Sequence, residues 1–112
     1  MQQTTNTPKN KGKLATGELI AQVAKYIDEA VSVHIIWDVP GIASGETTIE
    51  RPVADHDTGM RRLEIADSSD IETAFALCYD QPDLAISESD QAGGHSVCLL
   101  GTNLECWLIC ES

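Results

Sequence analysis

Positive charge is scarce over most of this chain. The 112 residues contain seven lysines and arginines against eighteen acids, for a net charge of −11. Residues 1–25 hold four lysines and one glutamate, whereas residues 26–112 hold three arginines, seventeen acids and no lysine. Lysine and arginine are the groups that bind phosphate backbones and anionic membranes. We therefore expect no direct nucleic-acid binding and no membrane binding.

Several sequence signals are missing. No run of about 18 apolar residues occurs, which excludes a membrane-spanning helix. No basic segment leads into an apolar stretch, as it would in a secretory signal, so we expect a cytoplasmic protein. The sequence also lacks internal repeats, a P-loop, a G-x-G-x-x-G motif and a G-x-S-x-G motif. With two Trp, two Tyr and one Phe, the core must be built mainly from aliphatic side chains.

The length predicts one domain, since domains average about 150 residues. Residues 1–13 are polar and contain three lysines. We predict that they form a disordered basic arm, followed by a single domain over residues 14–112.

Residues 16–30 have the strongest helical pattern. Thr16 is a suitable N-cap, and Glu18 falls in the first turn, near the positive end of the helix dipole. Apolar side chains recur at the spacing of one helical face; they are Ile20, Val23, Ala24, Ile27 and Val31.

A second helix is predicted within residues 67–82. Ser69 and Glu72 have the spacing of a capping box, and Pro82 would end the helix. Apolar side chains again follow the i, i+3, i+4, i+7 pattern; they are Ile71, Ala74, Phe75 and Cys78.

The remaining segments favour strands. The predicted strands are 31–39, a weak edge strand within 46–53, 61–66, 84–88, and a hairpin of 95–101 and 104–111 around Thr102–Asn103, with a turn at 54–59. Alternation directs Val33, Ile35, Trp37 and Val39 to the core in the first strand, and Leu63 and Ile65 in the third. The expected fold is a two-layer α+β domain, with two helices on a mainly antiparallel sheet of about five to six strands and the hairpin at its centre.

The four cysteines match no zinc-binding pattern, and we expect reduced thiols packed in the core. Two hairpin registers remain open. A loop of Gly101–Asn103 places Cys98 opposite Cys106 and allows a disulfide. A loop of Thr102–Asn103 places Cys98 opposite Trp107 and does not.

No catalytic, cofactor-binding or metal-binding residues are assigned, and we do not expect an enzyme. His34 and Asp38 are about 13 Å apart along one strand, too far to share an ion. Asp55, His56 and Asp57 are better explained as a solvated acidic turn than as a calcium loop. His95 and Cys98 would face opposite sides of one strand, which does not suit nucleophilic catalysis.

The leading hypothesis is an acidic module that binds a basic protein, such as a nuclease or a nucleic-acid-binding complex, and inhibits or masks it, as immunity, anti-defence or antitoxin proteins do. Acidity that serves solubility alone would give the same composition. The candidate contact residues are Glu46, Glu50, Asp55, Asp57, Asp67, Asp70, Asp80, Asp83, Glu88 and Asp90.

Two alternatives remain open. The expected element order is similar to that of small acidic secretion chaperones, except that the chain ends in a strand; this implies an adaptor, compatible with a homodimer, that binds an extended segment. A small metal- or ligand-binding protein would require His34, His56 and His95 to converge with cysteines.

Overall fold

The structure, a computed structural model, describes residues 12–91 and 93–112. It contains one helix in that part of the chain, α2 (Gly17–Glu29). The strands are β1 (Lys13–Leu14), β2 (Ser32–Val39), β3 (Ala43–Glu50), β4 (Pro52–Asp57), β5 (Arg62–Asp67), β6 (Asp70–Cys78), β7 (Ala85–Gln91), β8 (Gly94–Gly101) and β9 (Leu104–Glu111). Apart from Lys13 and Gly12, the expected basic arm lies outside the described residues.

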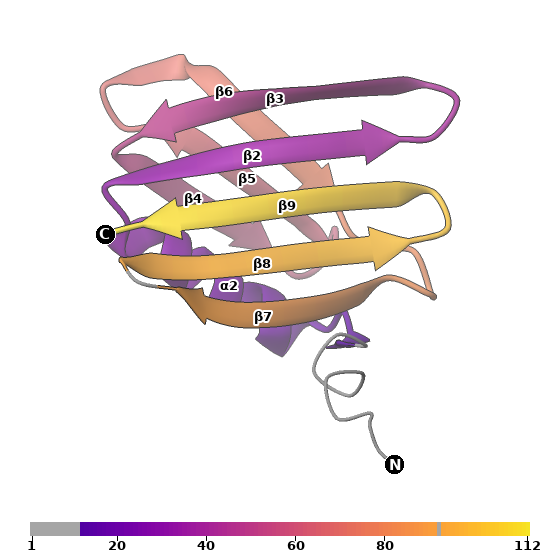
Figure 1. Ribbon diagram of the computed structural model, residues 1–112. Coiled ribbons are helices and arrows are strands. Elements are labelled where there is room, and N and C mark those ends of the chain that lie inside the picture. Colours follow the sequence, from indigo (N-terminus) through magenta and orange to yellow (C-terminus); the bar gives the residue numbers. More distant parts are fainter. Residues whose placement is uncertain (1–11, 92) are drawn as a thin grey trace.

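The strands form two antiparallel sheets. The large sheet has the order β1-β7-β8-β9-β2-β3, and the small sheet has the order β4-β5-β6. Figure 1 shows the small sheet behind the large one, with α2 beside β4 and behind β8 and β7. The expected fold of two helices on one sheet is therefore wrong: one helix and a second sheet together cover the large sheet.

The core lies between these two layers. The large sheet contributes the fully buried side chains Val33, Ile35, Ile49, Val97, Leu99 and Leu108. The small sheet contributes Leu63, Ile65 and Leu77, and α2 contributes Ile20, Val23 and Ile27. These residues confirm that the core is mainly aliphatic, although Tyr79 is also fully buried.

Helix α2 begins where the sequence predicts. The Thr16 hydroxyl accepts a hydrogen bond from the Leu19 N–H at 3.2 Å. Its predicted apolar face is buried except at Val31, which lies beyond the helix and is 58% exposed. The Asp28 carboxylate accepts a hydrogen bond from the Ala54 N–H at 2.7 Å and so joins the helix to the outer edge of β4.

No described helix is long and apolar enough to cross a membrane.

The predicted second helix is wrong. Residues 70–78 form β6, which pairs with β5 so that Phe75 faces Ile65 and Leu77 faces Leu63. Two residues assigned to the apolar helical face, Ala74 and Cys78, are exposed.

The predicted capping residue makes a turn instead. The Asp67 carboxylate accepts hydrogen bonds from both the N–H and the hydroxyl of Ser69. These bonds stabilise the turn between β5 and β6. These polar residues do form local hydrogen bonds, but they do so in a hairpin turn, where Asp and Ser side chains also hydrogen-bond to the nearby backbone.

The turn predicted at 54–59 begins later than expected, since β4 extends to Asp57. The edge strand within 46–53 is two strands, separated at Arg51, where the chain passes from the large sheet to the small one. Arg51 has a left-handed φ of 47°, and its N–H donates to the Val31 carbonyl at 2.8 Å. The break at Arg51 lets β3 remain an edge strand while Pro52 starts a strand in the other layer.

The C-terminal hairpin is confirmed as β8 and β9, at the centre of the large sheet. Its register places Cys98 opposite Trp107 and Leu99 opposite Cys106. Side chains alternate along each strand, so Cys98 and Cys106 lie on opposite faces of the sheet. All four cysteines are free thiols, and Cys78 is exposed rather than in the core.

The hydrogen bond from the Ala54 N–H to the Asp28 carboxylate allows a test of how α2 and the small sheet are joined within the layer that covers the large sheet. We expect Asp28→Ala to lower the free energy of unfolding by about 1 kcal/mol, because it removes an acceptor from an edge N–H. Asp28→Asn keeps an acceptor oxygen and should lose less. Glu29→Ala is the control on the same helix, and urea denaturation is the measurement. Equal losses for Asp28→Ala and Glu29→Ala would contradict this role.

Candidate functional site

The outer face of the large sheet is uncovered. Alternation along β2 buries Val33 and Ile35 on the inner side and directs His34, Ile36 and Asp38 outward. Both α2 and the small sheet lie on the inner side (Figure 1). Several large apolar side chains are consequently exposed to solvent on this face.

The strand registers define a row of side chains across this face. The row consists of Ser87 on β7, Cys98 on β8, Trp107 on β9, Ile36 on β2 and Glu46 on β3. A neighbouring row contains Ala85, Leu100, Glu105, Asp38 and Ser44. Leu14 of β1 pairs with Ala85 and extends the second row at its apolar end.

One half of this face, which we call the acidic half, consists of the outward side chains of β9, β2 and β3. Its five carboxylates are Asp38, Glu46, Glu50, Glu105 and Glu111. No lysine or arginine is among the described outward residues of the large sheet's strands. His34 is the nearest basic group: its Nδ1 hydrogen-bonds the Thr48 hydroxyl at 2.8 Å, and its Nε2 lies 3.2 Å from the Glu46 carboxylate.

The other half, which we call the apolar half, consists of the outward side chains of β1, β7 and β8, together with Trp107 and Ile36 at the boundary. Leu14 is 62% exposed, Leu100 54%, Trp107 39% and Ile36 37%. The Trp107 indole N–H donates to the Glu105 carboxylate at 3.0 Å. The indole therefore belongs to both halves: its ring is apolar and its N–H contacts a charged group.

The ten acids predicted from the sequence occupy several separate places. Glu46 and Glu50 lie on the acidic half. The others lie on the small sheet (Asp55, Asp57), at the β5–β6 turn (Asp67, Asp70), in the loop before β7 (Asp80, Asp83) and along β7 (Glu88, Asp90). Only the first pair shares the outer face of the large sheet.

Some of these acids stabilise turns. Asp83 accepts hydrogen bonds from the hydroxyl and the N–H of Thr102 in the β8–β9 turn. Both bonds lower the pKa of Asp83 below its usual value, and the bond from the hydroxyl has the larger effect. The hydroxyl and N–H of Ser69 likewise lower the pKa of Asp67. A carboxylate in such a turn contributes to the fold whether or not it also meets a partner.

Three carboxylates of the acidic half, Asp38, Glu105 and Glu111, were missed as contact residues. Because side chains alternate along a strand, the sequence already places Asp38 on the face of its strand that points away from the core. The same rule applied to residues 104–111 places Glu105 and Glu111 together with Trp107. What the sequence could not show is that β9 and β2 are neighbours, which brings Asp38 directly opposite Glu105.

The three histidines do not converge. His34 lies on the outer face, whereas His56 on β4 hydrogen-bonds the hydroxyl of Tyr79 in the interior. Burial raises the pKa of that phenol. Within residues 12–91 and 93–112 there is no group of three or more His, Cys, Asp and Glu residues that could hold a metal ion.

His95 does have a carboxylate and a thiol as neighbours. Its Nδ1 lies 2.8 Å from the Asp90 carboxylate, and its ring stacks on Tyr26 with centroids 4.1 Å apart. Cys110 is directly opposite on β9, and a cavity of about 50 Å³ lies between these groups. Burial raises the pKa of the Cys110 thiol to about 11, so it remains protonated at neutral pH. A nucleophilic cysteine needs the thiolate, so this arrangement does not support catalysis.

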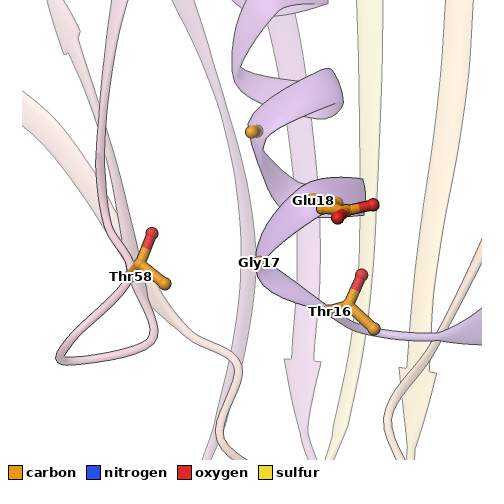
Figure 2. A pocket seen from close by; sticks show the side chains of 5 residues that line it. Thr16, Gly17, Glu18 and Thr58 are labelled. Carbon is orange, nitrogen blue, oxygen red and sulfur yellow. The ribbon is translucent and has the colours of Figure 1, made fainter.

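A larger hollow, of about 590 Å³, opens at the start of α2. It is lined by Thr16, Gly17, Glu18, Ala21 and Thr58. Figure 2 shows Thr58 across the hollow from the first turn of the helix, with Glu18 in that turn. The Glu18 carboxylate already offsets the positive end of the helix dipole and would repel an anion. The hollow is therefore unsuited to an anionic ligand.

Comparison with protein-family models, with curated proteins and with solved structures finds no match to this chain. The surface of the chain itself is therefore what points to a function.

Burial predicts which cysteines react. It raises the pKa of Cys106 to about 12 and that of Cys110 to about 11, while Cys78 is exposed. At pH 8 we expect a thiol-specific reagent to label one cysteine quickly in the folded protein and all four in urea. Cys78→Ser should abolish the fast phase. Rapid labelling of Cys106 or Cys110 in the native protein would contradict the structure.

The role of Asp83 predicts a pH-dependent stability effect. Its folded pKa is lowered, so its contribution is present above the unfolded pKa of about 3.9 and is lost as the pH falls through the folded pKa. Asp83→Asn should therefore lower the urea midpoint at pH 7 and have little effect near pH 2. Asp80→Asn removes a charge from the same loop and serves as the control. A deficit that is constant with pH would exclude this explanation.

Proposed function

We propose that this chain is an acidic protein-binding module that acts in the cytoplasm by occupying the basic surface of a partner protein. The partner class that fits best is a nuclease or a nucleic-acid-binding complex, inhibited or masked as in immunity, anti-defence or antitoxin systems. Such partners carry cationic grooves for phosphates, and an acidic protein can compete for those grooves.

The supporting observation is that the negative charge is left largely unneutralised. Among the described residues, a single carboxylate lies within 4 Å of an arginine or lysine side chain, in the pair Arg62–Glu64 at 2.8 Å. The other described acids accept hydrogen bonds from uncharged groups, lie beside histidines or face solvent, and so keep their negative charge. An uncompensated surface potential accelerates encounters with a cationic partner and disfavours anionic competitors.

The similarity to secretion chaperones loses its basis, because it depended on a second helix that is instead β6. A feature that still suits an adaptor is β3, one of the two edge strands of the large sheet, which is open to strand addition. Strand addition uses backbone hydrogen bonds and should resist salt, so salt dependence separates it from our proposal.

The test is capture of partners by the full-length protein from its own cells, at about 50 mM and about 500 mM salt. We expect the retained proteins to be basic and to be released at the higher salt concentration. An unrelated acidic protein of similar size and charge is the control. The captured protein is then purified, and its nucleic-acid cleavage or binding is measured with and without this chain.

Inhibition of that activity in a stoichiometric, salt-sensitive manner is the expected result. Capture of the same proteins by the acidic control, or full activity of the partner in the presence of this chain, would overturn the proposal. Salt-insensitive capture would favour the adaptor.

A further inference from the structure

The outer face of the large sheet joins an uncharged apolar half to an acidic half. Outward side chains on β1, β7 and β8 include Leu14, Ala85, Cys98 and Leu100, and none of the described ones carries a charge. All five carboxylates of the face are on β9, β2 and β3. The boundary is formed by Trp107 and Ile36, which pair directly across β9 and β2.

Two features of this face are unfavourable for the isolated protein. Asp38 and Glu105 are directly opposite each other on neighbouring strands, and like charges in that relation destabilise a sheet. Leu100, 54% exposed, lies beside Glu105 on the other side. A cationic group placed between the two carboxylates would relieve the repulsion, and an apolar group over Leu100 and Trp107 would remove their surface from water.

From this arrangement we infer that the outer face is the binding surface for the partner, and that the partner presents an apolar strip beside a row of lysines or arginines. This inference rests on the proposed function and adds the site and the form of the partner's surface. The apolar strip covers Leu100, Trp107 and Ile36. The cations meet Asp38, Glu105 and Glu46.

A second copy of this chain does not fit the same face. Symmetric pairing would bring one acidic half near the other or bury it against apolar side chains. Neither arrangement supplies a counter-charge, because the described outward residues include no lysine or arginine. Charge complementarity therefore selects a basic partner over symmetric self-association through this face.

The experiment uses the full-length protein labelled with ¹⁵N and two peptides of about 14 residues with identical lysine positions. One peptide has leucines along the opposite side of its helix, and the other has serines there. We expect the leucine peptide to bind roughly tenfold or more tightly than the serine peptide. Chemical-shift changes should gather on β8, β9 and β2, including the Trp107 indole N–H.

Matched variants separate the two halves. Leu100→Ser should remove most of the preference for the leucine peptide while leaving binding of the serine peptide unchanged. Asp38→Asn should weaken binding of both peptides several-fold and reduce the salt dependence. Glu72→Gln makes the same charge change on an exposed residue of β6 in the small sheet and should have little effect.

The outcomes separate this inference from the proposed function. Equal losses for Glu72→Gln and Asp38→Asn, or shift changes spread over both sheets, would show that the outer face is not the site, although the protein would still bind its partner through charge. Equal affinity for the two peptides would overturn the role of the apolar half. Failure of both peptides to bind at low salt would count against the proposed function itself.

Discussion

The structure depends on covering the inner face of the large sheet. Six strands spaced about 4.8 Å apart form a face roughly 24 Å wide, whereas a helix is about 10 Å across. A single helix leaves more than half of that face exposed to water. The small sheet covers the rest, and Asp28 joins it to α2 by accepting the Ala54 N–H at the edge of β4. Because the core has few aromatic side chains, it relies on close packing of aliphatic residues from both layers.

This arrangement leaves the other face of the large sheet without a covering layer. The alternation that buries Val33, Ile35 and Leu108 turns Asp38, Ile36 and Trp107 toward solvent. The small sheet has an exposed side too, but there Arg62 pairs with Glu64. The outer face of the large sheet therefore combines exposed apolar area with carboxylates that no nearby arginine offsets. A binding surface for a basic protein is consistent with both features.

The interior supplies little reactive chemistry. Cys106 and Cys110 are held as thiols by burial, and the histidines are divided between the two faces and the core. His95 has a carboxylate partner, but the thiol opposite it is protonated. The function that we propose, recognition by surface charge and apolar contact, uses the surface rather than these interior groups.

The sequence by itself determined the elements that depend on local interactions. The Thr16 cap and the apolar face of α2, the inward positions of β2 and β5, and the C-terminal hairpin all follow from local periodicity and turn residues. Tertiary structure alone decided the state of residues 70–78, because their apolar spacing suits a helix, whereas pairing with β5 as a strand buries Leu77 and partly buries Phe75. It also decided which acids lie together, since Asp38 and Glu105 are 67 residues apart in the chain and become neighbours only when β9 pairs with β2. Local patterns specify which way a side chain points, but strand order specifies what lies beside it.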